Sequence, residues 1–429
     1  MNFVQITPGA GGMYCGNCFR DNALVAELRR QGHQTLMIPL YLPMTLEEAD
    51  QSTGTPIFFN GINVYLEQKW PWFRRAPQWV HRLTAAPALL KLVAGSAAKT
   101  RAEDVGDTMI SMLRGENGHQ ARELDELIAW LKTQPKPDAI CLSNALLIGM
   151  ARKLRQELQA PVISLLQGED SYLDSLLPAH REAAWELMIQ RAADVSLFLT
   201  PSQYFATIMA RRLKLPDQKI RILANGINLE GFMPAQRILS DQPTLGFFAR
   251  MCKDKGLDLL VGIYIELRRR NSIPGLRLKI GGGCGPADEA FINEQKNRLQ
   301  QAGVLADVEW HPNLDREAKL AFLQSLTLFC VPAMYGEAFG LYVIEAMAAG
   351  IPLVQPRVAA FPEIIEPAGA GLLAEPNVGS MADAMEQLLR NPSRLKELGA
   401  NGQKAAAEKY SMPQMARNLQ TIVTGLGQG

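Results

Sequence analysis

The strongest constraint on the fold is a repeated alternation of short apolar runs with longer amphipathic stretches. An apolar run at 3–7 is followed by a glycine-rich turn at 8–12 and a helical pattern over 22–31 that stops at Gly32. A second apolar run follows at 35–39. Strands that alternate with helices are typical of parallel sheets, because each helix returns the chain to the same end of the sheet. The opening residues therefore predict a β-loop-α-β unit.

The same alternation continues in two series. The first series predicts further strands at 139–142, 162–166, 195–200 and 220–223. The second series predicts strands at 245–249, 276–280, 308–310, 328–331 and 352–355. Polar, proline-containing residues 236–243 separate the two, and a chain of 429 residues exceeds one ordinary domain. We therefore predict an α/β protein with two Rossmann-like, doubly wound parallel-sheet domains and a hinge at 236–243.

An insertion at about 45–120 interrupts the first domain and carries an amphipathic cluster. Within it, aromatic and basic side chains follow one another closely: Trp70, Trp72, Phe73, Arg74, Arg75, Trp79, His81 and Arg82. One interpretation is an aromatic helix packed on the domain. The other is a segment that binds an acceptor or lies on a membrane surface, so that the protein contacts the membrane peripherally.

Composition excludes several classes of protein. The 44 basic residues nearly cancel the 43 acidic ones, so overall charge gives no reason to expect a nucleic-acid partner. The start of the sequence lacks the pattern of a signal peptide, and no run of about twenty apolar residues occurs. We therefore expect a cytoplasmic protein.

The six cysteines do not form a disulfide framework, because only Cys15 and Cys18 are closely spaced. We expect reduced cysteines. A redox role for the Cys15 and Cys18 pair and a zinc site are minor alternatives, since no second Cys or His pair accompanies them at ligand spacing.

Two cations follow the first strand of the second series. Arg250 stands at the end of the predicted strand 245–249, and Lys255 stands at the start of the next helix. Ligands of doubly wound sheets bind at the carboxyl ends of the strands. An arginine fork and a lysine point charge at this place can hold a diphosphate, although a generic surface pair has the same appearance.

A longer motif with two glutamates follows the predicted strand 328–331. Glu337 lies in the loop after the strand, Phe339-Gly340-Leu341 opens a helix, and Glu345 lies on that helix. Free amides at a helix start can receive phosphate or sugar oxygens. Carboxylates accept hydrogen bonds from paired hydroxyls, so Glu337 suits a sugar and Glu345 suits a ribose diol. Glu345 stands in an apolar run, and a buried carboxylate needs a partner.

Arg250, Lys255 and the motif from Glu337 to Glu345 resemble the donor-site signature of family 4 retaining glycosyltransferases, and the resemblance extends over nearly the whole chain. Gly11-Gly12 resembles the glycine loop of the family. Further matching segments are Asn225-Gly-Ile-Asn228 with Phe232, Ile280-Gly-Gly-Gly-Cys-Gly-Pro286, which contains Gly282, and Tyr410-Ser-Met412.

This resemblance implies a GT-B arrangement of two domains facing each other across a cleft. Residues 1–237 would bind the acceptor, 238–410 would bind the nucleotide-sugar, and 411–429 would form a helix that crosses back to the first domain. The implied reaction is transfer of a sugar, by a hexosyltransferase that retains the anomeric configuration, to a carbohydrate or lipid-linked acceptor. The implied catalytic residues are Arg250, Lys255, Glu337 and Gln167, and the implied donor-binding residues are Gly11, Gly12, Gly282, Phe339, Gly340, Leu341 and Glu345.

The first domain departs from the family pattern after the strand at 162–166. Many relatives carry a histidine there, whereas this chain has Gln167, whose neutral amide can still meet a sugar hydroxyl. Glu169 and Asp170 follow and are candidates for binding the acceptor, or they form an acidic pair at a helix start.

No Asp-x-Asp pair occurs in the chain, so we expect a reaction without a metal and without a cofactor other than the nucleotide-sugar as co-substrate. A nicotinamide-dependent enzyme is disfavoured because Gly281, Gly283 and Gly285 have the wrong spacing for a dinucleotide loop and Pro286 interrupts the helix start. A glucan synthase and a protein that binds nucleotide-sugars without turnover remain as alternatives.

Overall fold

The computed structural model describes residues 1–9, 16–44, 46, 48–59, 102–232 and 242–426. The chain divides into two compact units. Unit 1 comprises Met1–Ala224 with Met415–Gly429, and unit 2 comprises Asn225–Gln414. Gly11, Gly12, Cys15, the cluster from Trp70 to Arg82 and most of the predicted hinge lie outside the described residues.

Unit 1 contains a six-stranded parallel sheet. Its strands are β1 (Asn2–Thr7), β2 (Gln34–Pro39), β3 (Ala139–Leu142), β4 (Val162–Leu165), β5 (Leu197–Thr200) and β6 (Ile220–Ile222). Their order is β2-β1-β3-β4-β5-β6. Strands β3, β4 and β5 are buried along their whole length, which explains their continuous apolar sequences. The chain winds outward from β1 in one direction and continues from β3 in the other, so β1 and β3 flank a topological switch point.

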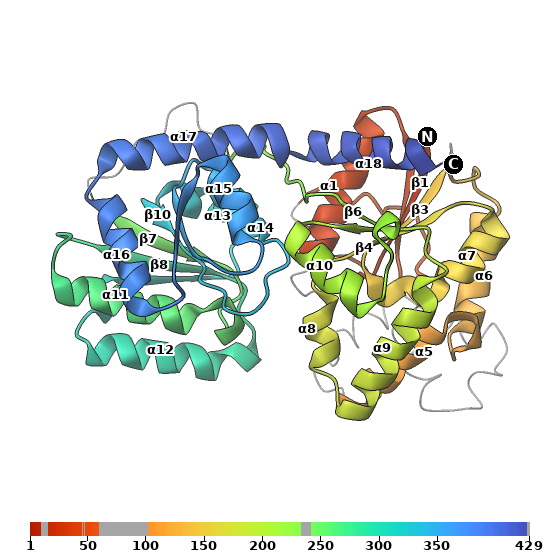
Figure 1. Cartoon of the computed structure of the whole chain (residues 1–429), viewed down its shortest axis with the longest axis horizontal. Helices are drawn as coiled ribbons and strands as arrows, with labels where there is room; N and C mark the ends of the chain where they lie inside the picture. The colour runs from red at the N-terminus through yellow and green to blue at the C-terminus, as the bar shows by residue number, and fades with distance from the viewer. Residues whose placement is uncertain (10–15, 45, 47, 60–101, 233–241, 427–429) are drawn as a thin grey trace. The chain divides into compact units, whose positions relative to one another are not determined.

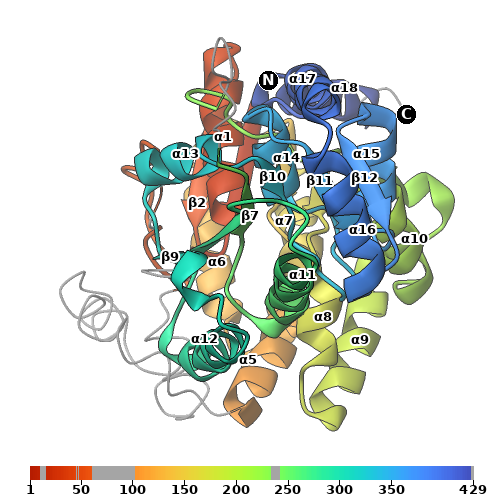
Figure 2. The same ribbon diagram turned by 90° about the vertical axis from the view of Figure 1, so that its left-hand side faces the viewer.

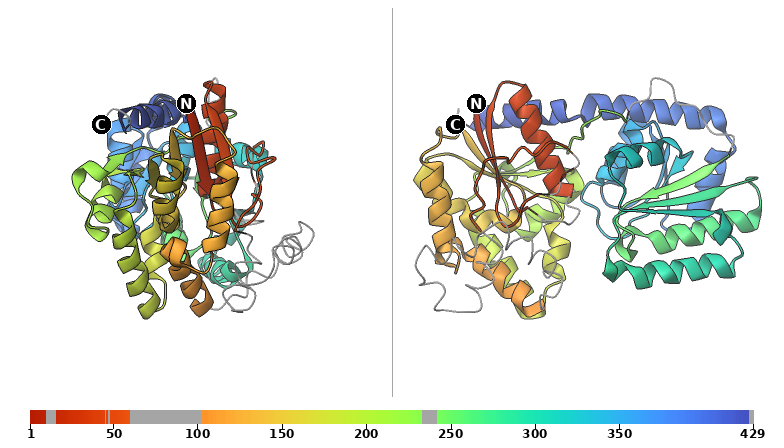
Figure 3. Two further views of the ribbon diagram at one scale, coloured as in Figure 1. Left: turned by 90° about the vertical axis from the view of Figure 1, so that its right-hand side faces the viewer. Right: turned by 180° about the vertical axis from the view of Figure 1, so that it is seen from behind.

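Helices cover this first sheet. They are α1 (Gly16–Arg30), α5 (Ala102–Arg114), α6 (Ala121–Leu131), α7 (Ala151–Leu158), α8 (Glu169–Asp174), α9 (Pro178–Ala192) and α10 (Gln203–Arg212). Figure 3 shows α1 in red alongside the equally red β1 and β2, which it contacts. Cys18 on α1 is disulfide-bonded, which corrects the expectation of reduced cysteines for this residue.

Unit 2 repeats the design. Its strands are β7 (Thr244–Phe248), β8 (Arg277–Gly282), β9 (Val308–Pro312), β10 (Leu328–Phe329), β11 (Leu353–Pro356) and β12 (Gly371–Ala374). Their order is β12-β11-β10-β7-β8-β9, and all pairs are parallel. The switch point therefore lies between β7 and β10. The prediction of an α/β protein with two doubly wound parallel sheets is confirmed, although β12 was not predicted.

The helices of unit 2 form a layer on each face of the sheet. Figures 1 and 2 show one layer with α11 (Leu257–Arg270), α12 (Glu289–Gln301) and α16 (Val378–Leu389). The other layer contains α13 (Arg316–Gln324), α14 (Leu341–Ala348), α15 (Phe361–Ala368) and α17 (Pro392–Lys409). The hydrophobic core of unit 2 lies between these layers and the sheet.

The last described helix, α18 (Met412–Leu426), follows unit 2 in the sequence. From Met415 onward it belongs to unit 1. Met415, Leu419 and Val423 are buried at a spacing of four residues, which places them on one face of the helix. None of the helices among the described residues is long and apolar enough to span a membrane.

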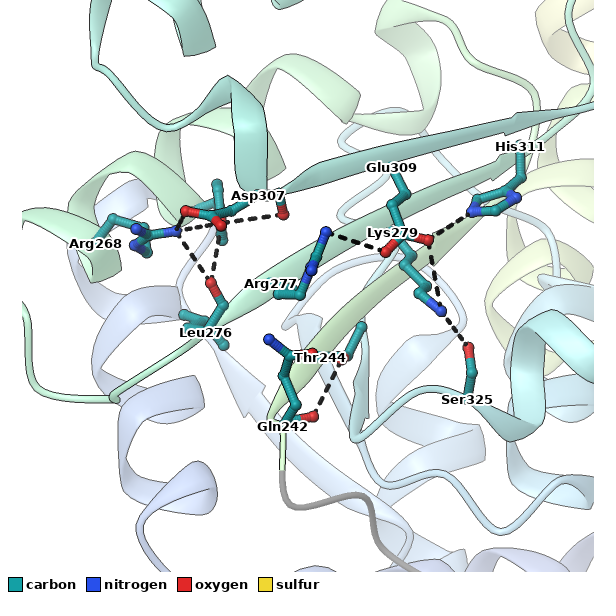
Figure 4. Close-up of polar contacts among 11 residues, drawn as sticks. Gln242, Thr244, Arg268, Leu276, Arg277, Lys279, Asp307, Glu309, His311 and Ser325 are labelled. Carbon is teal, nitrogen blue, oxygen red and sulfur yellow. Dashed lines mark hydrogen bonds and ion pairs between the residues drawn. The ribbon is translucent and has the colours of Figure 1, made fainter.

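Strand β9 forms one edge of the second sheet, and charged side chains cover one of its faces. Glu309 lies 3.3 Å from Arg277, 3.7 Å from Lys279 and 3.2 Å from the ring of His311 (Figure 4). The Nζ of Lys279 also donates to the hydroxyl of Ser325 at 3.1 Å. Charges beside an edge strand oppose pairing with a strand of another molecule.

Candidate active site

The switch point of unit 2 brings together the segments that follow β7 and β10. The loop after β7 carries Arg250 and leads into the short helical turn Lys253–Lys255. The loop after β10 carries Glu337 and leads into α14. Because β7 and β10 are paired neighbours in a parallel sheet, both loops leave the sheet at the same edge. The topology therefore joins two motifs that lie about eighty residues apart in the sequence.

Lys255 and Glu337 form an ion pair at this edge. The Nζ of Lys255 donates to Oε2 of Glu337 at 2.5 Å, and both side chains are largely buried. Burial lowers the pKa of Lys255, but the charge and hydrogen bond of Glu337 outweigh it and raise this pKa above its usual value. The ammonium group also lies 5.9 Å from the ring centre of Tyr335 and 5.5 Å from that of Tyr342. Lys255 therefore stays charged, because one carboxylate and two aromatic rings surround its ammonium group.

Gly256 allows the turn that presents Lys255. Its φ is +71°, and a Cβ at this position would lie 1.9 Å from the carbonyl oxygen of Pro332. Backbone therefore lies against backbone where the β7 loop meets the β10 loop. Only glycine fits this approach without displacement.

Arg250 is held by Asp288, the last residue of the short helical turn Pro286–Asp288 that precedes α12. Its Nη2 donates to Oδ1 of Asp288 at 3.0 Å and its Nε donates to Oδ2 at 3.3 Å. The hydrogen bond to Asp288 raises the pKa of Arg250. The arginine side chain is 63% exposed whereas that of Asp288 is 8% exposed, so the guanidinium keeps donors for a ligand. Asp288 fixes the direction in which Arg250 points.

Gly282 shapes the turn beside Arg250. Its φ is +122°, and a Cβ would lie 2.0 Å from the carbonyl oxygen of Ala249. The neighbouring amide of Met251 donates to the carbonyl of Gly283 at 2.8 Å. These contacts join the ends of β7 and β8, so Gly282 has at least a structural role in placing Arg250.

Helix α14 starts where the motif from Glu337 to Glu345 predicts a helix start. Gly340 is the N-cap residue with φ +84°, and Leu341 is the first helical residue. Phe339 is buried and its ring meets that of Tyr410 edge to face at 5.8 Å. Glu345 finds its partner in Lys319, whose Nζ donates to Oε1 of Glu345 at 3.0 Å. The lysine side chain is 3% exposed, so the pair satisfies two largely buried charges.

The predicted residues of unit 1 follow β4. Both carboxylate oxygens of Glu169 accept backbone amides, that of Ala145 at 2.9 Å and that of Gln167 at 2.8 Å. Burial raises the pKa of Glu169 in spite of these amides. Glu169 thus braces the segments after β3 and β4. Burial likewise raises the pKa of Asp170, whose Oδ1 is buried without a hydrogen-bond partner. The role of Gln167 toward a sugar hydroxyl and the roles of Glu169 and Asp170 in binding an acceptor stay predictions.

Sequence reasoning missed the side chains that hold the predicted ones in place, namely Asp288, Lys319, Tyr335 and Tyr342. Lys319 stands in the middle of the apolar face of α13. A buried lysine needs a carboxylate partner, so its position in the sequence could have indicated an ion pair. Asp288 offered a weaker signal as an acidic residue three positions after Gly285. Among the described residues, no group of three His, Cys, Asp or Glu side chains could hold a metal ion.

Two doubly wound parallel sheets in one chain, the second with cations and carboxylates at its switch point, define the class of two-Rossmann-domain glycosyltransferases. Comparison with protein families agrees. Residues 22–226 match the model described as glycosyl transferase 4-like domain, and residues 230–405 match that of glycosyl transferases group 1. The chain therefore belongs to the family 4 glycosyltransferases of GT-B type.

Curated relatives match about half of the chain. The MMP alpha-(1->4)-mannosyltransferase of Mycolicibacterium hassiacum is 34% identical over 233 residues, which are 54% of this chain and 54% of the relative. The phosphatidyl-myo-inositol mannosyltransferase of Mycobacterium leprae is 27% identical over 47% of this chain and 52% of its own length. The chain thus spans about half the length of these relatives.

Solved structures share the fold over the whole chain. Sucrose-phosphate synthase from Thermosynechococcus elongatus superposes with a TM-score of 0.71 at 17% identity, covering 100% of this chain and 99% of that structure. HepE from Anabaena, in complex with UDP, superposes with a TM-score of 0.67 at 14% identity, covering 99% and 100%. At these identities the likeness concerns the fold.

Proposed function

We propose that this protein is a retaining, metal-independent glycosyltransferase that transfers a hexose from a nucleoside diphosphate-sugar to a carbohydrate or lipid-linked acceptor. The observation that carries the proposal is the ion pair of Lys255 with Glu337 at the switch point of unit 2, with Arg250 in the same loop as Lys255. Sugar-nucleotide ligands of HepE and the mannosyltransferase names of the curated relatives support it.

The proposed chemistry rests on stabilising the charge of the leaving group. The bond between the anomeric carbon of the sugar and the phosphate oxygen breaks, and negative charge grows on the nucleoside diphosphate. Arg250 offers fixed guanidinium donors and Lys255 offers a permanent positive charge at this position. Preorganised charges of this kind are the largest contribution to many enzymatic rates. The acceptor hydroxyl oxygen then bonds to the same face of the sugar, as retention requires, and its proton passes to the departing phosphate oxygen.

The carboxylates are assigned to sugar hydroxyls. We assign Glu337 to the transferred hexose and Glu345 to the ribose diol, with the open amides at the start of α14 facing phosphate oxygens. Gln167 is assigned to a hydroxyl of the hexose, and Glu169 and Asp170 to placing the acceptor. Gly11, Gly12 and Gly282 would allow close approach of backbone amides to the diphosphate. No cofactor besides the co-substrate is proposed.

A donor screen with two variants tests the proposal. The purified protein is incubated with UDP-glucose, ADP-glucose and GDP-mannose, and both sugar release and thermal shift are measured. Arg250→Ala and Lys255→Ala should each lower turnover of the active donor by about 100-fold or more, because each removes a stabilising charge. Arg394→Ala is the control, since Arg394 is an exposed residue of α17 that pairs with Glu397.

The outcomes separate the candidate functions. Near-normal turnover in both variants would remove the basis for the proposed site. Donor binding without any sugar release or transfer would support the alternative of a nucleotide-sugar-binding protein. Chain extension of an α-glucan primer would support the alternative of a glucan synthase.

A further inference from the structure

Tyr342 lies inside the motif from Glu337 to Glu345 and contacts the first of its two glutamates. Its hydroxyl donates to Oε2 of Glu337 at 2.9 Å, the same oxygen that receives the Nζ of Lys255. Burial and the nearby charge of Glu337 raise the pKa of Tyr342 well above its usual value. The hydroxyl therefore keeps its proton and acts as a permanent donor.

Two donors on one oxygen leave the other oxygen of Glu337 available. Among the described contacts, Oε1 of Glu337 receives no hydrogen bond, whereas Oε2 receives two. Tyr342 is the second residue of α14, and its ring centre lies 6.4 Å from that of Phe329 and 5.5 Å from the Nζ of Lys255, which limits its movement. Its hydroxyl thus restricts rotation of the Glu337 carboxylate about its last bond. Without that contact, Glu337 could turn and pair with Lys255 through either oxygen.

We propose that Tyr342 is a positioning residue that fixes Glu337 so that Oε1 faces a hydroxyl of the donor sugar. This inference rests on the proposed function and extends it to a residue that lies inside the motif from Glu337 to Glu345 but has no role assigned from the sequence. Tyr342 acts through Glu337 and serves recognition of the sugar, while the nucleoside diphosphate is held by Arg250 and by Lys255.

The principal variant is Tyr342→Phe, which removes one hydroxyl and keeps the ring beside Lys255. We expect its affinity for the bare nucleotides UDP, ADP and GDP to stay within about twofold of the parent protein, as measured by calorimetry. We expect its kcat for release of sugar from UDP-glucose, ADP-glucose or GDP-mannose to fall about 10- to 100-fold, as loss of a hydrogen bond to a charged group does.

Tyr264→Phe is the matched control for loss of a buried hydroxyl. The hydroxyl of Tyr264 donates to the carbonyl of Leu276 at 3.1 Å and lies away from the switch point, at the far end of β8. This variant should lose stability with no change in kcat. If Tyr342 had only a structural role, Tyr342→Phe would likewise lose stability without a change in kcat. A kcat of Tyr342→Phe equal to that of the parent protein would therefore overturn the proposal.

A double-mutant cycle asks whether Tyr342 acts through Glu337. In the background of Glu337→Gln, the further change Tyr342→Phe should alter kcat less than about threefold, because the coupled carboxylate is already absent. An undiminished penalty in that background would show that Tyr342 acts elsewhere.

The same four proteins give a second cycle from urea unfolding without any ligand. Coupling between the two positions is expected, and strictly additive losses would contradict the hydrogen bond itself. The parent protein could bind none of the three nucleotides and cleave none of the three nucleotide-sugars, while the unfolding cycle still shows coupling. In that case the proposed function is wrong, and so is the role of Tyr342 in recognising the sugar. Turnover in the parent that persists unchanged in Tyr342→Phe defeats the positioning role alone.

Discussion

Single residues decide how closely the two loops of the unit 2 site approach. Gly256→Ala should destabilise the protein by more than the roughly 1–3 kcal/mol of a strained φ, because its Cβ would also meet the carbonyl of Pro332. The control is Gly303→Ala, which has the same φ of +71° and no atom within 4 Å of the added Cβ. Urea unfolding of both variants measures the difference. Equal losses would show that the contact with Pro332 is relaxed at no cost.

At the residue scale, the sequence alone was enough to select the side chains that stand in a recognisable local motif. Arg250, Lys255, Glu337 and Glu345 stand in recognisable motifs, and the structure brings the middle two together. The partners of Arg250 and Glu345, namely Asp288 and Lys319, were not predicted. The reason is physical: Asp288 meets Arg250 across 38 positions of sequence, and such contacts depend on the completed fold rather than on local pattern.

At the scale of elements, the last turn of α11 carries a cluster that responds to pH. Hydrogen bonds from Arg269 and then Arg270 lower the pKa of Glu266 from 4.5 to about 2. A carboxylate with a lowered pKa adds stability above its unfolded value. That stability should be fully present above pH 4.5 and disappear as the pH falls toward about 2.

Glu266→Gln tests this dependence. Urea midpoints of the variant and the parent protein should differ most at neutral pH and converge as the pH falls below 4.5. The difference at pH 7 should also shrink in high salt, because the group is on the surface. A difference between the two urea midpoints that grows as the pH falls would contradict the lowered pKa of Glu266.

The alternation of strands and helices made most elements of both sheets predictable. Buried parallel strands read as continuous apolar runs, as in β4 and β7. Strand β12 was not predicted, because Gly371–Ala374 has only four residues and only one of them is buried. Which strands lie adjacent does not follow from such runs, so the pairing of β7 with β10 that creates the site needed the structure.

At the scale of the molecule, the site should work without a divalent ion. In the proposed reaction Arg250 and Lys255 supply the positive charge that a metal-dependent enzyme takes from its ion, and the sequence lacks an Asp-x-Asp pair. Activity on the donor found in the screen should therefore be unchanged by EDTA. Loss of activity with EDTA and recovery with magnesium or manganese would refute this prediction.

Helix α18 should support unit 1 rather than unit 2. Leu419 is buried, so Leu419→Ala should cost about 2–5 kcal/mol of stability. Hydrogen exchange should accelerate in the strands β1 to β5 and remain unchanged in β7 to β12. Thr421→Ala on the exposed face is the control. Faster exchange confined to unit 2 would contradict the division of the chain at Met415.

The position of α18 in the sequence has a consequence for biosynthesis. A ribosome makes the sheet of unit 1 first, then all of Asn225–Gln414, and only afterwards the helix whose apolar face unit 1 buries. During translation of unit 2, the nascent first unit therefore exposes the surface that Met415, Leu419 and Val423 later cover. The unit whose synthesis begins first therefore receives its last segment only after the whole of the other unit has been made.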